Sequence, residues 1–318
     1  MSEIEYSEDK LLGEGHFGKV YQGKATKHGV TKEIAVKVLK KTPSELGEQK
    51  AFIRESELAK TLYSSSIMNV LYSYMGCDKW LLVTERAKIS LTKAIENEAK
   101  GTPCSWERSD GEIVAWNLTK KLRVIAGIAF GLAYLHKMGI IHCNLKPDNI
   151  LLDENMHPHI ADFGLSKMLP DTKDAIRDFV TMTGDMGTPL YMAPEIMNGE
   201  KYNCQADVFS FGMILYELMT GHAPWQGCEP PIRKIHELSM RVTSGQRPEI
   251  PAHIPENIKE LIESCWDPSP EARPTMEEIC ETLSSDSLDP QSGEPFDKEE
   301  IDAVIAEARE ELAKAKRP

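Results

Sequence analysis

Two periods of hydrophobic and polar positions divide the chain into unlike parts. Between residues 11 and 83, apolar and polar residues alternate, as at residues 20–23 and 34–39, and this period predicts β-strands. A helical stretch at residues 49–62 interrupts the strands. The first part of the chain is therefore predicted to form a small β-rich lobe.

From residue 91 onward the apolar spacing is helical. One broad apolar face recurs every three or four positions and comprises Leu118, Leu122, Ile125, Ile128, Ala129, Leu132 and Leu135. Similar stretches at residues 213–216 and 258–262 extend the pattern, which predicts a larger α-rich lobe. Glycine, proline, serine and aspartate are frequent at residues 101–111, which predicts a surface insertion, and at residues 284–295, which predicts a linker.

A separate amphipathic helix is predicted within residues 296–318. Asp297 and Glu300 stand at the spacing of a capping box, and Phe296 and Ile301 stand at the spacing of a hydrophobic staple around it. The apolar stripe is narrow and comprises Ile301, Val304, Ile305, Ala308 and Leu312. Two interpretations fit such a stripe: a helix that packs on its own domain, or one that binds a partner or dimerises.

Size and charge narrow the classes of function. The 318 residues exceed an ordinary single domain, which favours two lobes. They include 37 Lys and Arg against 50 Asp and Glu, a formal net charge of −13. This balance argues against nucleic acid or an anionic membrane as the partner.

Cysteine usage and the chain start bear on the compartment. The seven cysteines are scattered and form no Cys-x-x-Cys pair, so we expect neither a disulfide framework nor a zinc site. The start lacks a basic and apolar leader, and the longest apolar stretch, near residues 124–135, is too short to span a bilayer. These features predict a soluble, cytoplasmic protein.

A glycine-rich turn contains Gly13, Gly15 and Gly18. The missing Cβ atoms would let its backbone N–H groups approach phosphate oxygens. A dinucleotide-binding loop would open a helix, whereas residues 19–22 continue as a strand. In the next strand Lys37 is either a solvent-facing residue or an inward ammonium, and in the second case Glu55 on the following helix is its expected partner.

Several short motifs then follow one another along the chain. After Ile-Ala-Val-Lys at residues 34–37 come His-Cys-Asn-Leu-Lys-Pro-Asp-Asn at 142–149, Asp-Phe-Gly at 162–164, Gly-Thr-Pro-Leu-Tyr-Met-Ala-Pro-Glu at 187–195, Asp-Val-Phe-Ser-Phe-Gly at 207–212 and Cys-Trp-Asp-Pro at 265–268. In order and spacing, residues 8–283 resemble the eukaryotic protein kinases, most closely their tyrosine-kinase-like group of Ser/Thr kinases. The resemblance implies an α+β, bilobal kinase fold with a β-rich N-lobe and hinge at residues 1–87, a helical C-lobe at 88–283, and the linker and terminal helix beyond.

By this resemblance the cofactors are ATP and Mg²⁺. The glycine turn would cover the phosphates, Lys37 paired with Glu55 would hold the α- and β-phosphates, and Asn149 and Asp162 would ligate the metal with hard oxygen atoms. The residues expected around the adenine are Leu12, Val20, Ala35 and Leu151, the gatekeeper Thr84, and the hinge residues Glu85, Arg86 and Ala87. Structural roles are implied for His142, Glu195, Asp207 and Arg273, with Glu195 and Arg273 as a buried ion pair.

The sequence departs from the family at the catalytic base. Where the kinases have His-Arg-Asp, residues 142–144 read His-Cys-Asn, and the amide of Asn144 accepts a hydrogen bond but cannot usefully take a proton. A general base contributes about 10²- to 10⁴-fold. Phosphoryl transfer depends mostly on positioning and charge neutralisation, so a severe loss is expected rather than a total one, leaving on the order of 10⁻⁴ to 1 s⁻¹.

A second departure concerns regulation. Cys143 replaces an arginine that in many kinases meets a phosphorylated activation-loop residue, so phosphorylation of Thr181 or Thr183 is expected to matter less here. We interpret Cys143 as a small, semi-buried neutral residue, and a redox-sensitive thiol is the alternative. Lys146 and Thr188 resemble their counterparts in Ser/Thr kinases, not tyrosine kinases.

Three hypotheses follow. The leading one is a pseudokinase that binds Mg-ATP and presents a nucleotide-stabilised conformation to a partner protein. The alternative is a Ser/Thr kinase that transfers the γ-phosphate to protein hydroxyls, with Asn144 orienting the hydroxyl and Lys146 stabilising charge. The last is a scaffold that binds no nucleotide. It is disfavoured because such a scaffold would need neither the glycine turn nor Lys37, Asn149 and Asp162, and all of these are present.

Overall fold

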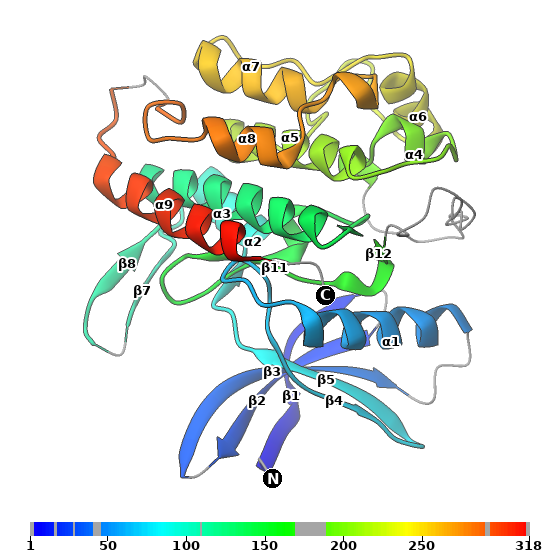
Figure 1. The fold of residues 1–318 in the computed structure, drawn as a ribbon, viewed down its shortest axis with the longest axis vertical. Helices are drawn as coiled ribbons and strands as arrows, with labels where there is room; N and C mark the ends of the chain where they lie inside the picture. Colours follow the sequence, from blue (N-terminus) through cyan, green and yellow to red (C-terminus); the bar gives the residue numbers. More distant parts are fainter. Residues whose placement is uncertain are drawn as a thin grey trace.

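The computed structural model describes residues 3–15, 18–27, 29–40, 46–108, 110–168, 189–289 and 293–315, and the structural statements below concern these residues. The first part of the chain forms a strand-rich lobe and the rest a larger helical lobe, as the two hydrophobic periods predicted (Figure 1). None of the helices in these ranges combines the length and apolarity needed to cross a membrane.

The smaller lobe is a five-stranded antiparallel sheet. Its strands are β1 (Glu3–Gly15), β2 (Gly18–Lys27), β3 (Val30–Lys40), β4 (Val70–Met75) and β5 (Lys79–Glu85), in the order β1-β2-β3-β5-β4. Because side chains of a strand alternate between two faces, Ile34, Val36 and Val38 of β3 share one face, where they are buried with Tyr21 and Val83.

The other face of the sheet carries the only long helix of this lobe among the described residues, α1 (Leu46–Thr61). Leu39 and Leu82 on this face pack with Phe52 of α1 and with Trp80. The ring centroids of Phe52 and Trp80 lie 5.2 Å apart. This apolar cluster holds α1 against the sheet, and the helix lies on the side of the sheet that faces the helical lobe (Figure 1).

The larger lobe consists mainly of helices. They are α2 (Leu91–Ala99), α3 (Leu118–Lys137), α4 (Pro194–Met197), α5 (Gln205–Thr220), α6 (Ile235–Thr243), α7 (Glu256–Cys265), α8 (Met276–Thr282) and α9 (Lys298–Lys314). Residues 124–135 of α3 and 206–218 of α5 are buried throughout, because both stretches are mostly apolar and other elements cover them. They form the centre of the core of this lobe.

The loops that hold the polar motif residues lie between short strands and 3₁₀ turns. One small sheet has the order β11 (Pro158–Ile160), β10 (Ile150–Leu152), β6 (Ile89–Ser90), and a second pairs β12 (Lys167–Met168) with β9 (Ile140–Ile141). Two 3₁₀ turns, η1 (Pro147–Asn149) and η2 (Phe163–Leu165), follow β9 and β11.

The expected surface insertion is a β-hairpin. Strands β7 (Ser105–Glu107) and β8 (Ile113–Ala115) pair with each other. The indole N–H of Trp106 donates to the carbonyl oxygen of Glu154 at 2.8 Å, which ties the hairpin to the loop between β10 and β11.

Helix α9 packs along α3 of its own chain, the first of the two interpretations of its apolar stripe (Figure 1). Ile301 and Ile305 are fully or almost fully buried there. Its start is half of the predicted capping box: Asp297 accepts from the backbone N–H of Glu300 at 2.9 Å, but the backbone N–H of Asp297 donates to the Thr119 hydroxyl. The Glu300 side chain is drawn away from its capping position because it pairs with cations of α3.

The segment predicted as a linker is packed where the structure describes it, at residues 284–289 and 293–295. Leu288 is fully buried, and both the backbone N–H and the hydroxyl of Ser285 donate to Asp302 at 2.8 Å. Ser285 and Asp302 therefore fasten this segment to α9, so it is not a loose tether.

Candidate nucleotide site and catalytic loop

One face of the sheet collects the residues expected around a nucleotide. Val20 lies opposite Lys37 in the β2–β3 register, and Ala35, two residues before Lys37, lies opposite Thr84 of β5. Residues that are directly opposite, or two apart on a strand, point to the same side of a sheet. Val20, Ala35, Lys37 and Thr84 therefore share the face that looks toward the helical lobe.

The glycines of the turn lie on strands β1 and β2, which pair with each other. Gly13, Gly15 and Gly18 all belong to the paired strands, with Gly13 opposite Val20 and Gly15 opposite Gly18. A Cβ on Gly18 would lie 2.5 Å from the carbonyl oxygen of Val38, and the φ of Gly18 is +137°. Only glycine fits there, which brings the backbone of the turn close to β3.

Lys37 is held by two carboxylates from different lobes. Its Nζ lies 2.7 Å from Glu55 Oε2 on α1 and 3.2 Å from Asp162 Oδ1 beside η2. Burial lowers the pKa of Lys37, but the charges of Glu55 and Asp162 outweigh it and the pKa ends above its usual range. The inward interpretation of Lys37 is the one that the structure shows.

Local backbone geometry aims Asp162 at Lys37. The residue adopts a left-handed conformation, with φ 67° and ψ 67°, directly before η2. Phe163, next in sequence, is buried and packs edge-on against the His142 ring at 5.3 Å between centroids. Burial raises the pKa of Asp162, but the charge of Lys37 and its hydrogen bond more than compensate, so the pKa lies below its usual range.

Asn144 and Asn149 complete the polar cluster. The side-chain amide of Asn144 donates from Nδ2 to Asp162 Oδ2 at 3.2 Å. Asn149 donates from its own Nδ2 to the backbone carbonyl of Asn144 at 2.7 Å. Both bonds use the amide nitrogen, which only donates. The Oδ1 atom of each asparagine keeps its capacity to accept a hydrogen bond or to ligate a cation. The positively charged Lys146 also acts on Asp162 and helps to keep it ionised.

Asp207, on α5, holds the loop that carries Asn144. Its carboxylate accepts from the backbone N–H groups of His142 and Cys143, at 2.8 and 2.9 Å, and lies 3.0 Å from the ring of His136. Burial raises the pKa of Asp207, but these hydrogen bonds lower it by a larger amount. The pKa therefore lies below its usual range, and the residue stays ionised. The brace is needed because Cys143 sits at φ 64°, which is costly for a residue with a side chain.

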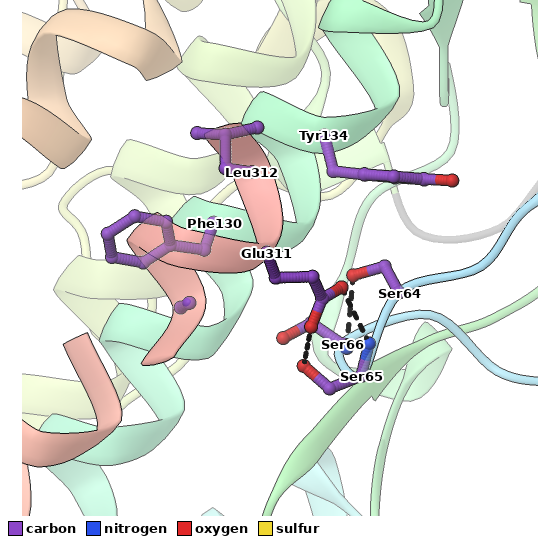
Figure 2. A pocket seen from close by; sticks show the side chains of 8 residues that line it. Ser64, Ser65, Ser66, Phe130, Tyr134, Glu311 and Leu312 are labelled. Atoms are coloured by element: carbon purple, nitrogen blue, oxygen red, sulfur yellow. Dashed lines mark hydrogen bonds between the residues drawn. The ribbon is translucent and has the colours of Figure 1, made fainter. Parts of the chain in front are cut away.

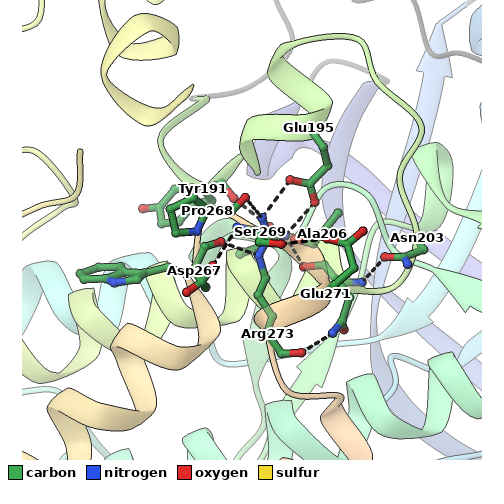
Figure 3. A network of polar contacts seen from close by, with 12 residues as sticks. Tyr191, Glu195, Asn203, Ala206, Asp267, Pro268, Ser269, Glu271 and Arg273 are labelled. Carbon is green, nitrogen blue, oxygen red and sulfur yellow. Dashed lines mark hydrogen bonds and ion pairs between the residues drawn. The ribbon is translucent and has the colours of Figure 1, made fainter. Parts of the chain in front are cut away.

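Glu195 and Arg273 form a buried, two-pronged ion pair (Figure 3). The guanidinium donates to the two carboxylate oxygens at 2.7 and 2.9 Å, and its remaining N–H groups bond backbone carbonyls, including that of Asp267 at 2.8 Å. Arg273 also stacks over the ring of Phe209 at 5.1 Å. The pair links the start of α4 to the segment before α8.

The remaining expected residues are placed around the same face with different exposure. Val20, Ala35, Thr84, Ala87 and Leu151 are half-buried, whereas Leu12 and Glu85 are exposed. Leu151 lies on β10, opposite Ser90. Thr181, Thr183 and Thr188 lie outside the described residues.

The surroundings of Cys143 were not anticipated. Its thiol donates to the hydroxyl of Tyr202 at 3.7 Å, and Lys167 lies over the Tyr202 ring at 5.2 Å. Burial, with a smaller effect of Asp207, raises the pKa of Cys143 to about 12. The thiol is therefore neutral near pH 7, which argues against the redox alternative. No sequence pattern near Cys143 points to Tyr202, because the two are 59 positions apart.

Comparison with known proteins decides the family. The family model described as the protein kinase domain matches residues 6–283, most of the chain. This chain belongs to the protein kinase family. The paired lobes, with the Lys37–Glu55 contact between sheet and helix, are thus those of a bilobal kinase fold.

Individual kinases from two sources resemble this one. It is 33% identical over 294 residues to the dual specificity protein kinase shkB of Dictyostelium discoideum. The matched region covers 90% of this chain and 42% of shkB. The dual specificity protein kinase shkD of the same organism is 31% identical, with 95% and 38% covered. A putative serine/threonine-protein kinase/receptor, R831, of Acanthamoeba polyphaga mimivirus is 33% identical, with 88% and 16% covered. The chain thus spans less than half the length of these relatives.

Proposed function

We propose that this kinase domain binds Mg-ATP and acts as a pseudokinase, or as a strongly attenuated Ser/Thr kinase, that presents its nucleotide-bound form to a partner protein. The observation that carries the proposal is the combination at one place of an assembled Lys37–Glu55–Asp162 cluster with an amide, Asn144, where the family has its base. A fold kept only as a scaffold would not need the buried lysine and its two carboxylates.

The donor set suits a hard divalent cation bound together with phosphates. Asp162 supplies a carboxylate that stays ionised, and Asn149 has its amide nitrogen engaged and its Oδ1 available. In the described part of the chain no group of three or more His, Cys, Asp or Glu could hold a metal without further help. Mg²⁺ commonly takes one or two protein oxygens plus phosphate and water, and when bound it would neutralise charge on the transferring phosphate.

The chemistry available to Asn144 is limited to orientation. With Nδ2 engaged by Asp162, its Oδ1 can accept a hydrogen bond from a substrate hydroxyl but cannot carry the proton away. Lys37 and Lys146 supply positive charge near the phosphates. The domain therefore retains positioning and electrostatic stabilisation and lacks general-base catalysis, which supports slow or no transfer.

The test is the rate of phosphate transfer from Mg-ATP to a basic protein substrate, with serine, threonine and tyrosine products separated because the Dictyostelium relatives are named dual specificity kinases. The natural chain is compared with Asn144→Asp and with Lys37→Met as background. We expect the natural chain near background and Asn144→Asp about 10²-fold above it. Transfer by the natural chain well above Lys37→Met would make it an active kinase, and the absence of Mg-ATP-dependent thermal stabilisation would leave only the scaffold.

A further inference from the structure

The turn between α1 and β4 is held by the C-terminal helix. The turn comprises Ser64, Ser65 and Ser66, and Figure 2 shows the side chain of Glu311, from α9, pointing at it. Glu311 accepts from the backbone N–H of Ser65 at 2.9 Å and from its hydroxyl at 2.7 Å. Both oxygens of one carboxylate are thus committed to one residue 246 positions away.

Helix α9 is a firm base for this contact. Near its start, Glu300 pairs with Lys120 and Arg123 of α3, at 2.7 and 2.5 Å. Near its end, Lys137 of α3 donates to the carbonyl of Leu312 at 2.7 Å. Arg309 binds backbone carbonyls around the end of α8, including that of Leu283 at 2.7 Å. The helix is fixed to the large lobe on both sides of Glu311.

The turn is also fitted against the large lobe by close packing. A Cβ on Gly131 of α3 would come within 3.0 Å of the Ser66 Cβ, so only glycine lets the turn lie this close. Ser66 accepts from the backbone N–H of Ile160 at 2.8 Å, and the N–H of Tyr63 donates to the Tyr134 hydroxyl at 2.9 Å. The turn thus packs on α3 and hydrogen-bonds to β11 without Glu311. Glu311 adds two hydrogen bonds at Ser65, on the outer side of the turn.

The position of this turn bears directly on Glu55. Leu58 follows Glu55 by three residues, so the two lie on one face of α1, and Leu62 comes directly after the end of the helix. Both leucines are buried in the core of the large lobe. A shift of the turn would therefore move the end of α1 and Glu55 with it, and the 2.7 Å contact to Lys37 tolerates only a few tenths of an ångström.

We infer that Glu311 is a positioning residue for the nucleotide site, acting through Ser65 and α1 on the Lys37–Glu55 pair. The inference rests on the proposed function for its consequence, nucleotide affinity, but not for its structural step. On this inference the segment after the kinase motifs contributes to the nucleotide site, because α9 sets how firmly α1 holds Glu55 against Lys37.

The test compares Glu311→Ala with Glu310→Ala, because Glu310 is the neighbouring exposed carboxylate of α9 and pairs with Lys314 of the same helix. Three quantities are measured well below the melting temperature: amide hydrogen exchange of residues 58–68, the rate at which an amine-reactive ester acylates the deprotonated amine of Lys37, and the Kd of Mg-ATP. Glu311→Gln, which keeps an acceptor at Ser65, is the conservative variant.

For Glu311→Ala we expect faster exchange in residues 58–68, faster Lys37 acylation and a Kd raised about 5-fold, the low end of coupling between distant sites, since the bonds of the turn to β11 persist. Glu311→Gln should recover part of each effect, and Glu310→Ala should match the natural chain. A lowered melting temperature with unchanged acylation and exchange would reduce Glu311 to a merely stabilising residue and overturn the inference. If the natural chain binds no Mg-ATP, the proposed function fails, whereas acylation and exchange still decide the role of Glu311.

Discussion

Asn144 donates its side-chain amide to Asp162, with 3.2 Å between Nδ2 and Oδ2. The amide thus occupies one oxygen of the carboxylate that also pairs with Lys37. An aspartate at position 144 would instead bring two carboxylates together, and like charges at this distance disfavour joint ionisation. Asn144 therefore does two things at once: it removes the base and it relieves a repulsion in the protein without metal.

The first prediction follows from that relief. Asn144→Asp should lower the free energy of unfolding in EDTA by about 2 kcal/mol, because a hydrogen bond to a charged group is lost and a repulsion is gained. Mg²⁺ or Mn²⁺ with a non-hydrolysable nucleotide should restore more stability to this variant than to the natural chain. Thermal denaturation with and without metal measures both effects.

Asn144→Ala is the matched control for the first prediction, because it loses the bond without adding a charge. It should be destabilised less than Asn144→Asp in EDTA and should gain no extra response to metal. Equal stability of Asn144→Asp and the natural chain in EDTA would show that the contact to Asp162 carries no weight.

Most of the fold could be predicted because it depends on local periodicity. The strand period of β3, with Lys37 in its middle, reflects one buried face, and the apolar run of α3 reflects burial along most of that helix, so burial decides both elements. The terminal helix α9 was predicted for the same reason. Its docking onto α3 was one of two open interpretations, because a stripe on one helix does not say which surface covers it.

The candidate site was predicted less completely than the fold. Motif order placed Lys37, Glu55 and Asp162 in one expected site, and the structure brings all three within hydrogen-bonding distance. The direction of the Asn144 amide and the presence of Tyr202 beside Cys143 depend on side-chain geometry and on contacts distant in sequence, for which no periodicity exists. Half of the capping box at Asp297 failed for a related reason, since tertiary cations captured Glu300.

The second prediction concerns the reactivity of Cys143. A thiol with a pKa of about 12 is on the order of 10⁻⁵ to 10⁻⁴ thiolate at pH 7.5, and only the thiolate reacts. Cys143 should therefore be alkylated by iodoacetamide at least about 10²-fold more slowly than the exposed Cys77. Peptide mass spectrometry of a time course measures both rates.

Unfolding supplies the control for the second prediction. In denaturant the two cysteines should label at rates within a few-fold of each other, since burial no longer separates them. Rapid native labelling of Cys143 would contradict its neutral, buried character and revive the redox interpretation.

The third prediction concerns the buried pair of Glu195 and Arg273. Arg273→Ala should cost about 3–5 kcal/mol of unfolding free energy, because it leaves the Glu195 carboxylate buried without its charged partner. Lys314→Ala, which breaks the exposed pair of Lys314 and Glu310, should lower the unfolding free energy by less than about 0.5 kcal/mol. Urea denaturation followed by tryptophan fluorescence measures both.

A double variant, Arg273→Met with Glu195→Leu, tests the physical cause of the third prediction. Removing both charges avoids an uncompensated buried carboxylate, so the double variant should be more stable than Arg273→Ala. If the double variant is the less stable of the two, the loss comes from packing around Phe209 and the backbone carbonyls instead of from the lone charge.

The fourth prediction is a pH dependence of stability that originates at His157. Burial, together with the charges of His159 and Arg123 and against that of Asp153, lowers the pKa of His157 to about 4. The unfolded chain takes up a proton at this residue near pH 6.5 and the folded chain near pH 4, so the contribution of His157 is fully present above pH 6.5 and is lost as pH falls between these values. From pH 7 to 5 this loss amounts to at most about 2 kcal/mol.

Measuring the unfolding free energy at both pH values, we expect His157→Gln to show a smaller drop than the natural chain, while His253→Gln, at an exposed site, shows the same drop. Equal drops in all three proteins would mean that His157 titrates alike in the folded and unfolded chain, and that its packing beside Ser66 does not exclude the charged form.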